Sequence, residues 1–352
     1  MKNNLFISFA TIIILFLISE SFVRFFFPQD LQRFWVYHEP KYGLPINKKN
    51  HKHNLHRFKS HKATYTFGKY HNRVTIKNFD NSNNPKVLVL GDSTTFGWLI
   101  DDENTFVHKL QKENLGYNFI NVGVGGWGTA HYTLFTELFC EQIKPEKIFV
   151  FLNTDDFYRG FVSGHYKDIN GDLIKSFRGY NDLQAPSKFD EKIPLYKFLK
   201  SNSHLFMLIR NVVYNKINEP YYNPWSKERY WARPNGEFDI DYSKKVSEFN
   251  KKIFLKLKDI SEKCNSNLHL LNFMWSNYTF MQNTNPNKFF LESAKDFFKE
   301  NNFNYFENSE KMSDLYNDPM KYIIKIDFHP NKDGVELIYQ SLREEVNKIL
   351  LN

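Results

Sequence analysis

Residues Lys86 to Gly97 read KVLVLGDSTTFG and combine an expected strand with an expected turn. In the first five residues, KVLVL, Lys86 is followed by an unbroken apolar run, which is typical of a parallel β-strand buried on both faces. Gly91-Asp92-Ser93 follows at once and predicts a turn from this strand into a helix, with the Ser93 hydroxyl at the carboxyl edge of a sheet. A serine presented there can attack a carbonyl carbon, although Gly-Asp-Ser by itself is also a common turn.

The apolar pattern recurs along the chain, and segments of helical periodicity alternate with it. This alternation predicts an α/β fold of three layers, with helices on both faces of a parallel five-stranded sheet and the functional site at the carboxyl ends of the strands. The expected strands are 86–90, 118–122, 147–152, 268–273 and 304–306, and the expected helices are 106–113, 129–142, 247–262, 287–300 and 332–350.

Three parts make up the expected domain organisation. Residues 1–27 form an N-terminal membrane anchor, and residues 28–85 form a polar preface in which 63–67 and 73–76 could pair as a small sheet. Residues 86–352 form the main domain. An insertion at about 160–243 interrupts this domain and carries a helix expected at 196–216.

The N-terminus contains the apolar run LFISFATIIILFLI, Leu5 to Ile18, and apolar character continues to Val23. This length approaches the roughly 20 residues that a helix needs to cross a bilayer. A cleaved signal peptide is the alternative, because Ser19 and Ser21 have the spacing of a cleavage site. The phenylalanines at 25–27 favour an uncleaved anchor, and either reading places the rest of the chain outside the cytoplasm, in a periplasm or at the cell surface.

Charge and cysteine content exclude several functions. The formal net charge is +8, but the densest basic stretch, 48–62, mixes His, Asn and Lys and contains no nucleic-acid-binding motif, so no nucleic-acid partner is expected. Cys140 and Cys264 are too few for a disulfide framework and wrongly spaced for zinc. One disulfide could form in an oxidising compartment, but two separate buried thiols are the expectation, and neither a metal nor a cofactor is expected.

Three further blocks carry residues suited to acyl chemistry. Residues 121–129 (NVGVGGWGT) are rich in glycine, which lets backbone N–H groups approach an oxyanion. Residues 152–156 (LNTDD) place polar side chains at the end of the third strand. Residues 327–334 (DFHPNKDG) place Asp327 two positions before His329, so that the carboxylate can fix the imidazole tautomer while the imidazole accepts a serine proton.

The glycine block also fits a dinucleotide site. Gly123, Gly125 and Gly128 satisfy G-x-G-x-x-G, and Asp155 lies roughly where a ribose-binding acid would fall. This alternative leaves the Gly-Asp-Ser and Asp-Phe-His blocks unexplained. It also places the fingerprint after the second expected strand, whereas dinucleotide-binding folds carry it after the first strand.

Taken together, the four blocks resemble those of the SGNH, or GDSL-like, hydrolases. The resemblance covers 86–156 and 323–342 and implies a flavodoxin-like sheet with Ser93 as nucleophile, His329 as general base and Asp327 as its orienting residue. It also implies an oxyanion hole built from the N–H groups of Ser93 and Gly126 and one side chain of the third block. Strict alignment puts Asp155 where the family has Asn, so Asn153 is expected to serve instead, with Asp155 as the alternative.

The resemblance implies an ester hydrolase or an O-acyltransferase that needs no cofactor. Its expected substrate is an acyl ester, with O-acetyl groups on an envelope polysaccharide favoured by the expected location. The alternative is a non-catalytic glycan-binding module of the same fold, which the Asp155 substitution favours. Trp225 and Trp231 in the insertion could stack on sugar rings, although an aromatic-rich satellite core is the more ordinary interpretation.

Overall fold

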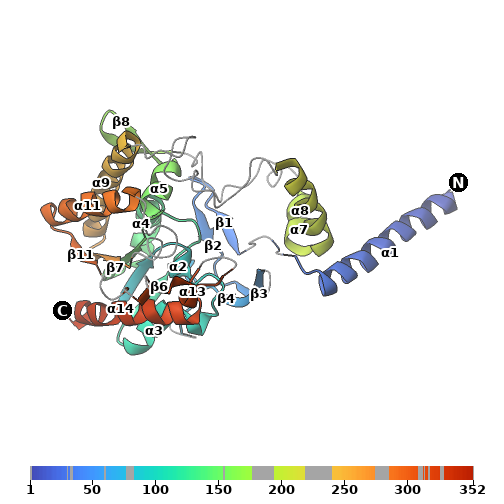
Figure 1. Cartoon of the computed structure of the whole chain (residues 1–352), viewed down its shortest axis with the longest axis horizontal. Coiled ribbons are helices and arrows are strands. Elements are labelled where there is room, and N and C mark those ends of the chain that lie inside the picture. Colours follow the sequence, from blue (N-terminus) through green and yellow to red (C-terminus); the bar gives the residue numbers. More distant parts are fainter. Residues whose placement is uncertain are drawn as a thin grey trace.

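The structure is a computed structural model, and its main body is an α/β domain from which one long helix projects (Figure 1). The helix is α1 (Lys2–Phe26), and two further helices, α7 (Pro194–Asn202) and α8 (His204–Asn218), lie between it and the body. The residues that the structure describes are 2–29, 31, 35–58, 61–76, 83–153, 155–176, 194–218, 240–273, 285–307, 312, 314–315, 318–325 and 329–351.

A parallel five-stranded sheet forms the centre of the body. Its spatial order is β11-β10-β7-β5-β6, and every neighbouring pair is parallel. This is the flavodoxin-like order, in which the chain direction across the sheet reverses beside the first strand, β5, and ligands bind at the carboxyl ends flanking that point. The strands are β5 (Lys86–Leu90), β6 (Asn118–Asn121), β7 (Lys147–Leu152), β10 (Asn267–Asn272) and β11 (Asn304–Glu307).

Two hydrophobic cores lie on the two faces of this sheet because successive strand residues point in opposite directions. Leu88 and Val150 belong to one core, and Val87 and Phe149 to the other. The predicted three-layer α/β fold with a parallel five-stranded sheet is therefore confirmed. The helices of the first face are α4 (Thr129–Ile143), α5 (Asp155–Val162), α9 (Ile240–Lys263) and α11 (Asn285–Glu300), and those of the second are α3 (Phe106–Glu113) and α14 (Lys332–Leu351).

The expected single helix at 196–216 is wrong, because the structure has α7 (Pro194–Asn202) and α8 (His204–Asn218) instead. Ser203 separates them, and its Oγ accepts the backbone N–H of Phe206 at 3.0 Å, as an N-cap does. A capping side chain therefore ends one helix and begins the next where apolar periodicity alone predicts continuity.

The helix α5 and the hairpin of β8 (Tyr166–Ile169) and β9 (Asp172–Lys175) were not expected from the sequence. The turn of this hairpin has a sequence pattern from which it could have been predicted. Asn170 and Gly171 join the strands with φ of 53° and 98°, and Asn-Gly is the preferred pair for a two-residue turn with both φ values positive.

The preface packs onto the main domain through two hairpins, β1 (Val36–His38) with β2 (Pro45–Asn47) and β3 (Lys52–Phe58) with β4 (His61–Thr66). The expected pairing of 63–67 with 73–76 reduces to one isolated bridge between Phe67 and Arg73, because β4 pairs with β3. An aromatic cluster joins the preface to the segment after β5, and its members are Trp35, Tyr65, Phe67, Phe96 and Trp98.

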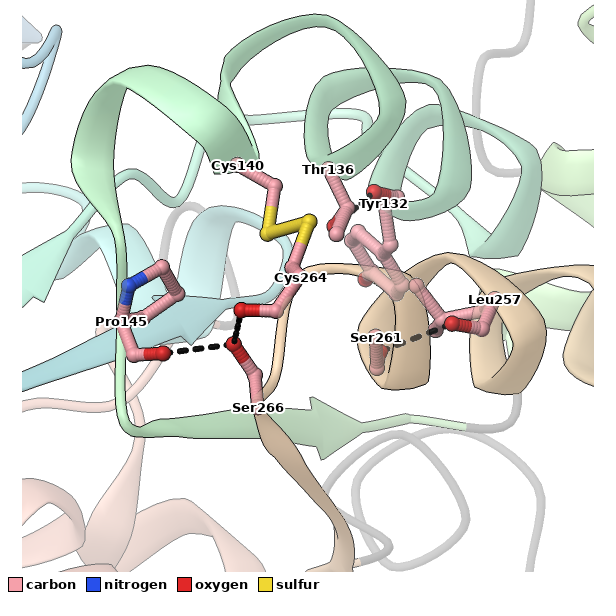
Figure 2. The surroundings of a disulfide bond; sticks show 8 residues. All are labelled: Tyr132, Thr136, Cys140, Pro145, Leu257, Ser261, Cys264 and Ser266. Atoms are coloured by element: carbon pink, nitrogen blue, oxygen red, sulfur yellow. Dashed lines mark hydrogen bonds between the residues drawn. A yellow bond between two sulfur atoms is a disulfide. The ribbon is translucent and has the colours of Figure 1, made fainter.

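Cys140 and Cys264 form a disulfide, with their Cα atoms 6.2 Å apart (Figure 2). The expectation of two separate thiols is therefore wrong. Cys140 lies in the last turn of α4 and Cys264 directly follows α9, and these two helices pack against each other. Nearby, the Ser266 hydroxyl donates to the Pro145 carbonyl at 2.5 Å, which ties the two chain segments again.

The helix α1 contains 21 residues, Phe6–Phe26, that are apolar and long enough to cross a membrane. Most of its side chains are exposed in the isolated chain, as Phe9, Ile12 and Leu15 are. Length and composition are thus compatible with either an anchor or a signal sequence.

Candidate active site

Ser93 begins α2 (Ser93–Phe96), a single helical turn that follows β5 directly. Asp92 is the N-cap residue, and its Oδ1 accepts the Thr94 N–H at 2.8 Å. Gly91 lets the chain turn this tightly, because a Cβ atom there would lie 2.1 Å from Thr95 Oγ1. The strand-to-helix turn predicted from Gly-Asp-Ser is therefore present, and it holds Ser93 at the carboxyl edge of the sheet.

His329 lies next to Ser93 although the two residues are 236 positions apart in the chain. Its Nε2 is 2.8 Å from Ser93 Oγ. The Ile324 N–H donates to the His329 carbonyl at 2.8 Å, and Ile323 bridges Pro330. The backbone on either side of the imidazole is thus held before α14 begins.

The start of α14 follows the predicted helix entry. The Gly334 N–H donates to Asn331 Oδ1 at 2.9 Å, and the Asn331 Nδ2 donates to the Lys321 carbonyl of α13 (Pro319–Tyr322) at 2.7 Å. Asn331 therefore caps the helix and fastens it to α13. Asp327, the predicted orienter of His329, lies outside the described residues.

The glycine block runs beside the Ser93 turn. The Val124 N–H donates to the Gly91 carbonyl at 3.3 Å, and a Cβ atom on Gly123 would lie 2.8 Å from the Phe96 backbone nitrogen. Gly126 follows with a φ of 87°, a left-handed conformation that glycine adopts without strain. The loop that carries Gly126 therefore approaches the turn that carries Ser93 at backbone distance.

Asn153 and Asp155 take different positions at the end of β7. Asn153 is buried, and its N–H donates to Asp156 Oδ2 at 2.8 Å while its carbonyl accepts the Asp156 N–H at 3.0 Å. Asp155 is the first residue of α5, and its Oδ2 lies 3.4 Å from Arg159 Nη2. Asp155 is thus engaged with a cation.

A cluster of three carboxylates and one guanidinium lies directly behind the serine turn. Arg159 Nη1 is 2.9 Å from Asp92 Oδ2 and 3.9 Å from Asp156 Oδ1, in addition to its contact with Asp155. Burial, opposed by Arg159, raises the pKa of Asp155 and raises that of Asp156 well above the usual range. This cluster was not predicted from the sequence, although Asp155 and Arg159 have the i, i+4 spacing of a helical ion pair.

Arg73 of the preface holds the other end of α2. Its guanidinium is buried, stacks on the Tyr65 ring at 4.5 Å and donates to the carbonyls of Phe96 at 2.6 Å and Gly97 at 2.7 Å. It also pairs with Asp102 Oδ1 at 2.9 Å. Sequence reasoning missed this residue because nothing local distinguishes it from the other basic residues of the preface.

The structure does not support a dinucleotide site, which was suggested by the G-x-G-x-x-G pattern and by the position of Asp155. The glycine block follows β6, which is an edge strand of the sheet, and Asp155 faces Arg159. Gly128 is explained by packing, since a Cβ atom there would lie 2.4 Å from the Asp156 carbonyl oxygen and 2.5 Å from the Gly160 nitrogen. These contacts bring α4 and α5 together, which is a structural reason for the glycine.

No protein-family model and no curated protein matches the sequence. Among solved structures, a psychrotrophic esterase from Pseudoalteromonas sp. is similar at 14% identity and TM-score 0.42, over 76% of this chain and 100% of that chain. A lipolytic protein of the G-D-S-L family from Desulfitobacterium hafniense matches at 14% identity and TM-score 0.41, over 74% and 99% of the two chains. An acetylxylan esterase from Geobacillus stearothermophilus matches at 12% identity and TM-score 0.40, over 74% and 94%.

Proposed function

We propose that this chain is a membrane-anchored serine hydrolase or O-acyltransferase of the SGNH type, which acts on acyl esters through an acyl-enzyme. The observation that carries the proposal is the 2.8 Å contact between Ser93 Oγ and His329 Nε2. A hydroxyl within hydrogen-bond reach of an imidazole, at the carboxyl edge of an α/β sheet, is the pairing that nucleophilic catalysis requires.

In the proposed reaction, Ser93 Oγ attacks the ester carbonyl carbon while His329 Nε2 takes the hydroxyl proton. The tetrahedral oxyanion accepts hydrogen bonds from the N–H groups of Ser93 and Gly126 and from the Asn153 side chain. Collapse expels the alcohol, which receives the proton from His329, and water or a sugar hydroxyl then releases the acyl group. Asp327 keeps its predicted role as the residue that orients His329.

The choice of Asn153 over Asp155 follows from charge. An ionised carboxylate would repel a developing oxyanion, whereas an amide can donate to it. Asp155 lies against Arg159, which gives it a different partner. We expect removal of the Asn153 amide to lower turnover on the order of a hundredfold.

The proposed location is outside the cytoplasm, with α1 as a single-pass anchor. The length and composition of α1 support an anchor, and the Cys140–Cys264 disulfide supports an oxidising compartment. In such a compartment the proposed substrate is an O-acetyl group on an envelope glycan. Trp225 and Trp231, the predicted sugar-stacking residues, lie outside the described residues.

Fluorophosphonate labelling of the full chain in detergent tests the catalytic proposal. We expect the native chain to be labelled, Ser93→Ala to abolish labelling, and His329→Ala to slow it by at least about a hundredfold. Ser341→Ala is the matched control, because this serine is buried in α14, where its hydroxyl donates to the Ile338 carbonyl at 2.6 Å. Undiminished labelling of Ser93→Ala would overturn the proposal.

A non-catalytic glycan-binding module is the second candidate, favoured by Asp155 at the position where the family pattern has Asn. Turnover of p-nitrophenyl acetate and of longer esters separates the two candidates. Hydrolysis that disappears in His329→Ala supports the enzyme. Binding of an acetylated glycan by a chain that is neither labelled nor active with any ester supports the module.

A further inference from the structure

The helices α7 and α8 expose apolar side chains outside the main body. Five large apolar residues on them are between 49% and 64% exposed, namely Leu195, Phe198, Ile209, Val212 and Val213. Elsewhere in the described body, large exposed apolar residues are single, as Leu115 is, or paired, as Ile169 and Ile174 of the β8–β9 hairpin are. A cluster of this kind marks a surface that meets an apolar partner.

The charges of α7 and α8 have one sign. Their sequences, PLYKFLKSN and HLFMLIRNVVYNKIN, contain four basic residues and no Asp or Glu. Arg210 Nε donates to the Tyr196 hydroxyl at 3.2 Å, so one basic group of α8 is held against α7. Apolar side chains combined with Lys and Arg, without acidic residues, are typical of helices that lie in the interface of a membrane with anionic lipids.

The turn between α7 and α8 is fastened to α1. The Glu20 carboxylate accepts the Ser203 hydroxyl at 2.7 Å, the His204 N–H at 3.0 Å and the Leu205 N–H at 2.9 Å. Arg24, one turn further along α1, donates to the Asn202 carbonyl at 2.6 Å. One face of α1 thus binds the end of α7 and the beginning of α8.

This junction fixes the level of α7 and α8 relative to the apolar span. Glu20 lies six residues before the end of α1 at Phe26, which corresponds to about 9 Å along the helix axis. If α1 crosses a bilayer with the body outside, that distance from its outer end is within the headgroup region and the adjoining ends of the acyl chains. The end of α7 and the beginning of α8 lie at this level, because they bind Glu20 and Arg24.

We propose that α7 and α8 lie in the outer interface of the membrane that α1 spans, with their exposed apolar side chains among the lipids. The inference rests on the membrane anchor of the proposed function and is independent of the catalytic chemistry. Continuity with α1 and the all-basic composition favour anionic lipid over a second protein. Anchored at α1 and at the α7–α8 surface, the body meets the membrane in one orientation.

Depth-dependent fluorescence quenching of the full chain in vesicles tests this placement. The vesicles contain phosphatidylcholine and phosphatidylglycerol, with nitroxide-labelled lipids that quench either at the headgroup or deep in the acyl region. The environment-sensitive label NBD is attached to Phe198→Cys, Ile209→Cys, Phe16→Cys or Leu115→Cys in separate preparations. Cys140 and Cys264 form the disulfide and do not compete for the label in the absence of reductant.

We expect the labels at 198 and 209 to be quenched by the shallow nitroxide, the label at 16 by the deep one and the label at 115 by neither. Leu115 is the matched control because it is also an exposed apolar residue, 57% exposed, but lies on the body between α3 and β6. Labels at 198 and 209 that stay unquenched while the label at 16 is quenched would overturn the interfacial placement.

Two further outcomes are distinguishable. An unquenched label at 16 would show that the anchor itself is wrong, and the interfacial placement would fail with it. The labels at 198 and 209 could also be shielded from the nitroxide lipids at high protein density and lose this shielding as the chain is diluted in lipid. That result would show that a second copy of the chain covers the surface, which also overturns the lipid assignment.

Discussion

Arg159 Nη1 lies 2.9 Å from Oδ2 of Asp92, the residue immediately before Ser93. The other Asp92 oxygen accepts the Thr94 N–H within the serine turn. One carboxylate therefore joins α5, which carries the guanidinium, to the turn that presents the nucleophile. The position of Ser93 depends on a helix whose residues lie more than sixty positions later in the chain.

We expect Arg159→Met to destabilise the chain by about 3 to 5 kcal/mol, because it leaves the acidic side chains of Asp92, Asp155 and Asp156 without their guanidinium contact. Arg159→Lys should cost less, since it keeps the charge but loses the fork that contacts two carboxylates at once. Urea denaturation measures both. Arg343→Met is the control, because its ion pair with Glu113 is partly exposed to solvent and should contribute at most about 1 kcal/mol. Equal effects of the two Met variants would contradict the structural role of Arg159.

Asp156 should make stability depend on pH. Burial raises its pKa well above the usual value, so the folded chain binds a proton there more tightly than the unfolded chain does. Stability should therefore fall as pH rises above about 4, where an unfolded Asp ionises, and continue to fall up to the raised pKa. Asp156→Asn cannot ionise and should flatten this part of the profile.

Thermal midpoints of the native chain and of Asp156→Asn between pH 5 and pH 8 measure the difference. Asp168 provides a control of opposite sign, because its hydrogen bond to Lys252 lowers its pKa at the surface. Its contribution is complete above the ordinary Asp pKa and is lost only as pH falls below it, so Asp168→Asn should leave the slope above pH 5 unchanged. Parallel profiles for all three chains would refute the assignment to Asp156.

Arg73→Lys should weaken the serine turn from the preface side. A lysine keeps the charge but cannot donate to several carbonyls in a fixed fork, so buried carbonyls at the end of α2 lose their donors. We expect a loss of about 3 kcal/mol of stability together with slower fluorophosphonate labelling of Ser93. Arg343→Lys, at a partly exposed site on α14, should change neither measurement. A fully stable Arg73→Lys chain would mean that the carbonyls find other donors.

Gly128→Ala should separate the packing role of the glycine block from a ligand-binding role. The added methyl group would meet backbone atoms of Asp156 and Gly160, which cannot rotate away. We expect a loss of about 1 to 3 kcal/mol, or more if α4 and α5 cannot move apart. Gly116→Ala is the matched control, because its Cβ atom would meet nothing within 4 Å. Similar unfolding midpoints for the two variants would contradict the close approach of the helices.

The sequence predicted β5 and β7 well because each of these central strands is an apolar run buried on both faces, whereas the edge strand β11 (NYFE) is only partly buried and has a weaker apolar pattern. Ser93 and His329 were predictable for a related reason, since each lies in a distinctive block at the end of a strand or before a helix. The contacts of Arg73 and Arg159 were not predictable. They depend on which distant carbonyls and carboxylates the fold brings close to each guanidinium. The residues next to an arginine in the sequence do not indicate these partners.

The break between α7 and α8 escaped prediction for a different reason. A serine inside an apolar, helical stretch is compatible with one helix or with two. The partner that favours two helices is Glu20, which lies in α1 and accepts the N–H groups at the beginning of α8. A boundary inside the insertion is thus set by a residue at the opposite end of the chain.

The Cys140–Cys264 bond closes a covalent ring of the polypeptide that contains the whole insertion, since the two cysteines lie on either side of it. A protease that cuts any peptide bond between them opens this ring without releasing a fragment. The nicked chain should run as one band on a non-reducing gel and as two bands after reduction. The insertion can therefore be lengthened, shortened or cut while the sheet and both residues of the Ser93–His329 pair remain part of one covalent molecule.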